Sequence, residues 1–101
     1  MRIVAAPNAF KGSLNAVEAA EAIKKGILAA MPRARVICVP VADGGDGLTE
    51  VMIDGMGGKL IEKRVTGPRM EALSAPFCLV ASQKLAVVEM ARASGLALLP
   101  R

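Results

Sequence analysis

Residues 2–39 decide the fold, and they read RIVAAPNAFKGSLNAVEAAEAIKKGILAAMPRARVICV. A β-branched pair near the start favours a short buried strand over residues 2–6, which the turn-forming Pro7-Asn8 ends. Helical spacing then predicts a helix over 16–31, and a second apolar run predicts a strand over 35–39. Strand, long helix and strand form the βαβ pattern, in which a right-handed crossover sets two parallel strands side by side. The sequence therefore predicts an α/β fold.

The helix over 16–31 has signals at both ends. Asn15 can cap it, with Glu18 three residues later completing a capping box, and Pro32 stops it. The apolar positions at helical spacing predict the buried face, and they are Val17, Ala20, Ile23, Ile27 and Ala30.

The rest of the chain alternates loops and short elements. A glycine-rich loop over 40–47 leads into a helix, and Pro76 restricts its own strand to an edge or a bulge. The expected elements are a helix over 48–56 closed by Gly57-Gly58, strands over 59–65, 72–81 and 85–90, a turn at 66–68 and a hairpin connection at 82–84. Combined with the βαβ unit, these elements lead us to expect a three-layer, Rossmann-like arrangement with a mainly parallel sheet.

The composition is unusually apolar. The set AVILMFWYC makes up 53% of the 101 residues, and the 10 glycines bring the fraction to about 63%, against the roughly 45–50% usual in soluble domains. One interpretation is a tightly packed core rich in Ala and Val. The other is an apolar face that packs against protein absent from this chain, or through which the chain self-associates.

Charge and cysteine content limit the classes of partner. The net charge of +4 is spread along the chain with no run longer than Lys24-Lys25, and Phe10 and Phe77 are the only aromatic residues, so a nucleic-acid partner is not expected. No segment is long enough to span a bilayer, and no membrane partner is expected. Cys38 and Cys78, without any histidine, cannot form a conventional zinc site, and two free thiols in a reducing cytoplasm are the expected state.

The first candidate loop follows the first strand and contains Lys11-Gly12-Ser13. A cation, a permissive backbone, a hydroxyl and a nearby helix start can together bind phosphate or carboxylate. The order of these residues is not that of a P-loop, which requires Gly-Lys followed by Ser or Thr. The alternative is an ordinary connection with a capping residue and an exposed lysine.

The second candidate loop follows the second strand and reads Asp43-Gly44-Gly45-Asp46-Gly47. Its glycines allow close approach to a ligand, and its two carboxylates suit Mg²⁺ or a general base toward a substrate hydroxyl. The glycine positions exclude an EF-hand. The alternative is a turn whose acids favour the following helix start.

Glu89 stands near the end of an otherwise apolar run. Burying a carboxylate without a partner is costly, so Glu89 either turns outward or lines a polar site together with Ser94-Gly95 beyond it.

Four segments in order resemble the signatures of the bacterial glycerate kinase family, type 1. They are Ala6-Pro7-Asn8-Ala9-Phe10-Lys11-Gly12-Ser13-Leu14, Val39-Pro40-Val41-Ala42-Asp43-Gly44-Gly45-Asp46-Gly47, Val65-Thr66-Gly67-Pro68, and Glu89-Met90-Ala91 to Ser94-Gly95-Leu96.

The resemblance implies a cytoplasmic enzyme that transfers the γ-phosphoryl group of ATP, with Mg²⁺, to a hydroxyl of D-glycerate. Such kinases have two α/β domains with the active site in the cleft between them, and they are several times longer than this chain. Residues 1–101 are therefore expected to be the N-terminal portion, with the remainder of both domains absent. The apolar ending without a polar tail also suggests a cut chain, and the isolated fragment is expected to be inactive.

Carried over to this sequence, the family's roles give Lys11 and Asp43 as catalytic residues and Asp43 and Asp46 as metal ligands. The implied substrate-binding residues are Asn8, Lys11, Gly12, Ser13, Gly44, Gly45, Glu89 and Ser94. Many members have Asp-Ser at positions 8 and 9 and Glu at position 46. Because an asparagine cannot accept a proton, Asn8 is expected only to orient the substrate.

Two alternatives to the kinase remain at this point. The chain could be a non-catalytic α/β module that binds a small anionic ligand, or an inert truncated product.

Overall fold

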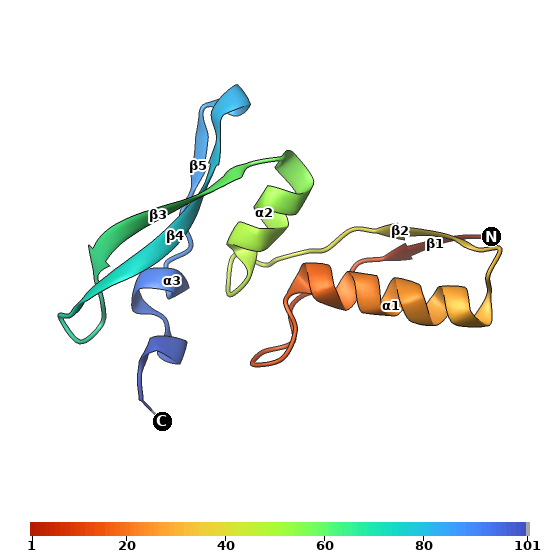
Figure 1. Cartoon of the computed structure of the whole chain (residues 1–101), viewed down its shortest axis with the longest axis horizontal. Coiled ribbons are helices and arrows are strands. Elements are labelled where there is room, and N and C mark those ends of the chain that lie inside the picture. The colour runs from red at the N-terminus through yellow and green to blue at the C-terminus, as the bar shows by residue number, and fades with distance from the viewer. Residues whose placement is uncertain (101) are drawn as a thin grey trace.

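The computed structural model describes residues 1–100. Figure 1 shows two parts, a strand-helix-strand unit at the N-terminus and a curved sheet further along the chain, with a short helix between them. The elements are β1 (Arg2–Ala5), α1 (Ala16–Ala30), β2 (Arg35–Cys38), α2 (Leu48–Met56), β3 (Lys59–Thr66), β4 (Ala72–Val80), β5 (Leu85–Val87) and α3 (Ala91–Ser94), with 3-10 turns at Ala81–Gln83 and Leu96–Leu98.

The N-terminal unit confirms the predicted βαβ pattern. β1 and β2 pair in parallel, with Arg2 opposite Arg35 and Ala5 opposite Cys38. α1 runs beside the pair (Figure 1) and covers one face, because the Cys38 thiol reaches the carbonyl oxygen of Ala20 at 3.5 Å.

The second sheet corrects the expectation of a mainly parallel, Rossmann-like arrangement. β3, β4 and β5 lie in the sheet in the same order as in the sequence, and both pairings are antiparallel. The connections explain the difference: the tight turn closed by the Gly67 N–H on the Glu71 carbonyl, and the 3-10 turn at Ala81–Gln83, are too short for a parallel crossover. The fold remains mixed α/β.

Pro76 lies on the central strand of this sheet, yet at a local edge. β5 pairs only with Cys78–Val80, so around Pro76 strand β4 has β3 on one side and no strand on the other. The prediction that Pro76 places its strand at an edge or a bulge is therefore wrong for β4 as a whole, although no second strand needs the missing N–H at Pro76 itself.

The ends of α1 were predicted correctly, and its buried face only in part. The Asn15–Glu18 capping box is present in both directions, at 2.9 and 3.0 Å. The fully buried positions are Ala16, Ala19 and Ala20, whereas Ile23 is 40% exposed. The fully buried positions therefore lie in the first half of the predicted face, and Ile27 in the second half is half-buried.

α2 packs against β4 through a close approach of backbone to side chain. A Cβ added to Gly58 would lie 2.4 Å from the Cys78 sulfur, so only glycine fits there. The pair Gly57-Gly58 was expected to close the helix, and Gly57 does so by donating its N–H to the Ile53 carbonyl. The glycine pair therefore serves both helix termination and sheet packing.

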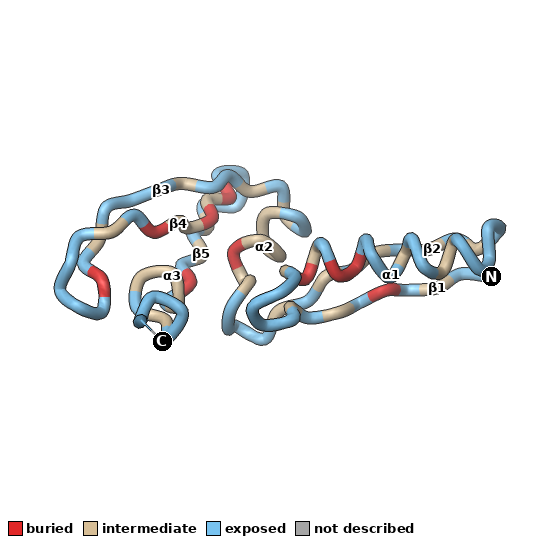
Figure 2. The backbone as a smooth tube through the Cα atoms, turned by 60° about the horizontal axis from the view of Figure 1, so that its bottom comes forward, coloured by how far each residue is buried: buried red, intermediate tan, exposed pale blue. Residues whose placement is uncertain are grey.

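The molecule is thin and exposes much apolar surface. Its extents are 52 × 38 × 17 Å and its radius of gyration is 16.0 Å, against about 13 Å for a compact chain of this length. It exposes 7126 Å², whereas a compact 10.4 kDa monomer exposes about 5,400 Å². Figure 2 shows buried residues restricted to short stretches of β1, α1, α2 and β4 and to the turns at Gly67 and Glu89. The tightly packed core considered from composition is wrong, and the alternative of an uncovered apolar surface fits.

Both cysteines are free thiols, as predicted. Within residues 1–100, no helix has the length and apolar character needed to cross a bilayer.

Candidate functional site

The two candidate loops lie side by side where β1 and β2 end. Beyond the strands the parallel pairing continues, because the Val39 N–H donates to the Ala5 carbonyl at 2.8 Å and the Val41 N–H donates to the Pro7 carbonyl at 3.0 Å. Ligands of open parallel sheets bind at this edge. The sequence therefore placed both loops at the correct end of the strands.

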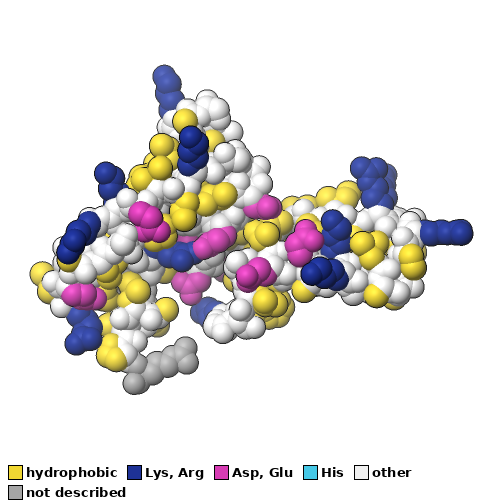
Figure 3. All heavy atoms as spheres, viewed as in Figure 1, with side chains coloured by type: hydrophobic (Ala, Val, Ile, Leu, Met, Phe, Trp, Pro, Cys, Tyr) yellow, Lys and Arg dark blue, Asp and Glu magenta, His cyan; other side chains and the backbone are white. Residues whose placement is uncertain are grey.

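A groove of about 760 Å³ opens between these loops, β4 and α3. Figure 3 shows acidic and basic side chains gathered around the hollow between the two parts of the molecule. Nine of the sequence-predicted residues line the groove, namely Asn8, Lys11, Gly12, Ser13, Asp43, Gly44, Gly45, Asp46 and Glu89. Residues from three distant segments thus meet in one place.

Ser94 is the predicted residue that does not line the groove. Its hydroxyl donates to the Met90 carbonyl at 3.2 Å, one turn back in α3. This bond is a local one, within the last turn of a short helix.

The first loop forms a closed turn with Lys11 at its tip. The Phe10 N–H donates to the Leu14 carbonyl at 2.9 Å, and the Ser13 N–H donates to the Phe10 carbonyl at 3.0 Å. At the start of α1, the capping box engages the Glu18 N–H. Lys11 lies in a separate turn before the helix, and its cooperation with the helix-start amides remains a prediction.

The second loop is shaped by one carboxylate and two left-handed glycines. Asp43 Oδ1 accepts the Gly45 N–H at 3.1 Å, and Gly44 and Gly47 have φ of +92° and +93°. No hydrogen bond or ion pair engages the Asp46 carboxylate within residues 1–100, and that carboxylate lines the groove.

Glu89 is buried, with 3% of the residue exposed, so the alternative that it turns outward is excluded, and it lines the groove without Ser94. Its Oε1 accepts the Gly47 N–H and its Oε2 accepts the Thr49 N–H, both at 3.0 Å. The carboxylate therefore closes the N-terminus of α2, where a negative charge is favourable.

Arg92 and Glu50 line the groove and were missed by sequence reasoning. Arg92 pairs with Glu50 and lies 3.5 Å from Glu89, between two carboxylates. The i,i+3 spacing of Glu89 and Arg92 was a usable signal. The pair with Glu50 joins residues far apart in the sequence, and no local pattern indicates it.

The charges of the groove favour a cation in it. The lining of the groove has a net charge of −2. Its two cations are Lys11 and Arg92, and its four carboxylates are those of Asp43, Asp46, Glu50 and Glu89. Within the described residues no three His, Cys, Asp or Glu side chains gather as metal ligands. Asp43 and Asp46 still suit Mg²⁺, which is commonly held by one or two carboxylates together with water and substrate phosphates.

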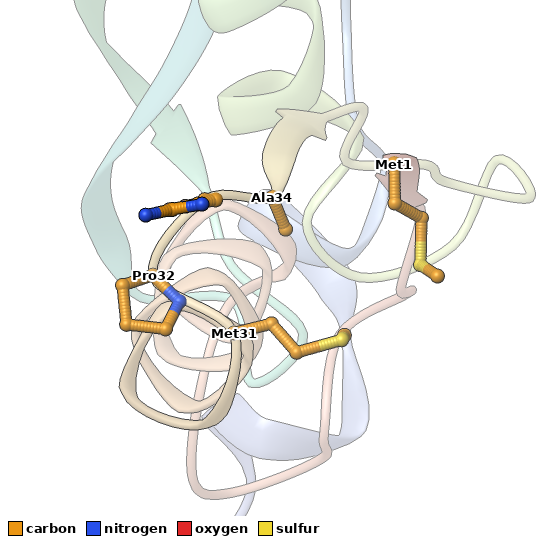
Figure 4. Close-up of a pocket in the computed structure, with 5 residues that line it drawn as sticks. Met1, Met31, Pro32 and Ala34 are labelled. Carbon is orange, nitrogen blue, oxygen red and sulfur yellow. The ribbon is translucent and has the colours of Figure 1, made fainter.

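A second hollow, of about 380 Å³, lies near the other end of the strand-helix-strand unit. Figure 4 shows Met1, Met31, Pro32 and Ala34 around it, and Arg33 completes the lining. Binding sites usually combine apolar walls with several convergent polar groups, and this hollow offers only one charged side chain. The groove at the loops is therefore the candidate site.

The sequence model of the Glycerate kinase family matches residues 3–101. The chain belongs to the glycerate kinase family. Among curated relatives, it is 47% identical over 100 residues to the glycerate kinase of Bacillus subtilis (strain 168) and 46% identical over 100 residues to the glycerate 2-kinase of Escherichia coli (strain K12). Each match covers 99% of this chain and 26% of the relative.

A solved structure agrees with this assignment of family. The chain matches a crystal structure assigned to glycerate kinase 2 from Salmonella typhimurium LT2 with a TM-score of 0.80 and 40% identity, over 99% of this chain and 27% of the other. The chain thus spans about a quarter of the length of the glycerate kinases it matches.

Proposed function

We propose that the polypeptide carrying this chain transfers the γ-phosphoryl group of ATP to a hydroxyl of D-glycerate, giving phosphoglycerate and ADP. The relatives named glycerate kinase support this proposal. The observation that carries it is the groove in which Lys11, the Asp43–Gly47 loop and Glu89 meet.

In this proposal the oxygen of the glycerate hydroxyl bonds to the γ-phosphorus while the bond from that phosphorus to the ADP oxygen breaks. Catalysis of phosphoryl transfer depends mostly on positioning and charge neutralisation. Lys11, on the tip of its turn, neutralises a phosphate or the glycerate carboxylate. Asn8, Ser13 and the glycine loop orient the substrate, and Asp43 accepts the hydroxyl proton or holds the metal.

Magnesium is proposed as the cofactor because glycerate and ATP are anions and the groove carries a net charge of −2. Asp43 and Asp46 would hold it, and Mg²⁺ neutralises charge on the phosphate oxygens when bound. Within residues 1–100 no hydrogen bond or ion pair holds the Asp46 carboxylate, so it could bind the metal without first breaking an interaction.

Residues 1–101 alone are proposed to be inactive. The chain spans about a quarter of the length of its relatives, which supports the proposal that further polypeptide is needed to complete the site. A cytoplasmic location is proposed from the two free thiols, which a reducing compartment preserves.

The proposal is tested by measuring ADP release from ATP, Mg²⁺ and D-glycerate with the polypeptide that carries this chain. Glycolate, lactate and L-glycerate serve as matched small hydroxy acids, and the 101-residue chain alone serves as the protein control. ADP release that requires D-glycerate supports the proposal. Binding of D-glycerate without ADP release would favour the anion-binding module instead.

A further inference from the structure

Glu89 reverses the usual order of burial in its segment. The carboxylate residue is 3% exposed, whereas its apolar neighbours Val88 and Met90 are 71% and 77% exposed. A chain that buries an acid and exposes its two hydrophobic neighbours needs strong partners for that acid, since unpaired burial is costly.

The partners are both at the glycine loop. The two oxygens are divided between Gly47 and Thr49, the N-cap and second position of α2, which follow the loop 43–46 directly. Gly47 has no side chain with which to cap the helix, and no cap of that kind is present. Glu89 supplies the missing cap from 42 residues away.

Arg92 adds a second connection between the same two segments. It pairs with Glu50 in the first turn of α2 while lying 3.5 Å from Glu89. The segment at α3 therefore holds the start of α2 by two amide hydrogen bonds and one ion pair.

We propose that Glu89 is a positioning residue, which fixes the glycine loop so that Asp43 and Asp46 face the groove, and that it does not itself contact glycerate. Only the expected effect on catalysis rests on the proposed function, and the contact of Glu89 with the glycine loop does not. Both oxygens of Glu89 already accept backbone N–H groups, whereas the Asp46 carboxylate lines the groove without such a bond within residues 1–100.

The first test uses the unmodified chain, so it does not depend on a variant that folds. Amide hydrogen exchange is measured by NMR for Gly47 and Thr49, with the exposed Gly44 of the same loop as reference. We expect exchange at Gly47 and Thr49 to be at least tenfold slower than at Gly44 after correction for intrinsic rates. Equal protection at the three amides would show that Glu89 does not hold the Gly47 and Thr49 N–H groups, and would overturn the proposal.

The second test compares Glu89→Gln with Glu71→Gln. Glutamine keeps the shape of Glu89 and one acceptor oxygen, so one of the two amides loses its partner and its proton shifts upfield. Glu71 also accepts a backbone N–H, from Arg69 at 2.8 Å, but in an exposed turn that does not line the groove. We expect Glu71→Gln to leave the Gly47 and Thr49 signals unchanged.

Steady-state kinetics separate positioning from substrate contact. For Glu89→Gln we expect a tenfold or greater rise in the Mg²⁺ concentration for half-activation, together with a lower kcat, and restoration toward wild type by Glu89→Asp. An unchanged Gly47 and Thr49 spectrum with a raised KM for glycerate alone would overturn the proposal in favour of direct binding. If the wild-type polypeptide does not phosphorylate glycerate, the proposed function fails, and the exchange experiment still decides the contact.

Discussion

Ala9 and Gly47 lie close together across the two loops of the groove: a Cβ added to Gly47 would lie 3.7 Å from the Cβ of Ala9. This is ordinary van der Waals distance, so space does not forbid a side chain at Gly47. The backbone conformation disfavours a side chain there, because Gly47 has φ of +93°. The geometry of the groove therefore depends on one left-handed residue that is also the N-cap of α2.

Gly47→Ala is expected to destabilise the fold by about 1–2 kcal/mol, the usual cost of a left-handed conformation in a residue with a Cβ. Gly55→Ala is the matched control, because Gly55 lies inside α2 with open space around the position of a Cβ. That control should stabilise by about 0.5–1 kcal/mol. Urea unfolding of the two variants checks the opposite signs, and equal effects would contradict the role of φ.

Lys11→Ala is expected to lower kcat/KM for glycerate phosphorylation at least tenfold. A hydrogen bond to a charged group contributes about 1.5–3 kcal/mol, and Lys11 is exposed on a turn closed by other residues, so its loss should not unfold the chain. Lys25→Ala on α1 is the control, since Lys25 is exposed and does not line the groove. Steady-state kinetics of both variants are compared, and unchanged kinetics for Lys11→Ala would remove it from the site.

Asp43→Asn is expected to weaken Mg²⁺ activation or turnover while preserving the loop. Asparagine keeps the oxygen that accepts the Gly45 N–H and loses only the charge. A Mg²⁺ titration of activity is compared with that of Asp54→Asn, a change at an exposed acid of α2 outside the groove. A raised half-activation concentration indicates a metal ligand, whereas a lower kcat at saturating Mg²⁺ indicates a base. A Mg²⁺ titration and a turnover rate equal to those of the wild type would show that Asp43 only stabilises the turn, through its hydrogen bond from the Gly45 N–H.

The local features were predictable from the sequence because their causes are local. The capping box of Asn15 and Glu18, the end of α2 at Gly57 and the strands flanking α1 all follow from neighbouring residues. The hairpin between β4 and β5 was predicted from its short connection, whereas the expectation of a mainly parallel sheet was wrong, because the βαβ pattern was extended to the whole chain.

The candidate site was predictable in its residues and not in their contacts. Position after parallel strands and the family motifs indicated two loops, and both line the groove. The hydrogen bonds of Glu89 to Gly47 and Thr49 span 42 and 40 residues, and nothing in the neighbourhood of either segment encodes them. Burial of such a carboxylate becomes understandable only when its distant partners are known.

The Cys38 thiol is expected to be less reactive in the folded chain than in the unfolded one. Burial, then the negative charge of Glu21 and a hydrogen bond to it, raise the pKa of Cys38 above its ordinary value of 9.0. The folded state therefore favours the neutral thiol, and this contribution to stability is lost as the pH rises above 9.0.

Iodoacetamide labelling at pH 8.5 checks this, since the thiolate is the reacting form and Cys78 is fully buried. Native labelling should be slower than labelling in urea. Glu21→Gln should lower the pKa of Cys38 and accelerate labelling, whereas Lys24→Gln should slow it, because the charge of Lys24 lowers that pKa. If the labelling rate changed in the same direction for both variants, the charges of Glu21 and Lys24 would not be the cause of the shift in the pKa of Cys38.

The isolated 101-residue chain is expected to self-associate through the uncovered face of the β1–β2 sheet. Val4 and Ile37 are paired in register on the face opposite α1, and they are 61% and 40% exposed. Parallel sheets are normally covered on both faces, and only one face is covered here. The double change Val4→Thr and Ile37→Thr should weaken association about tenfold or more, because it removes apolar contact while keeping β-branched side chains. Leu60→Thr, at a 52% exposed position of β3, is the matched control and should change little. Light scattering across a concentration series measures the effect, and a monomer at every concentration would show that this face does not pair with a second copy.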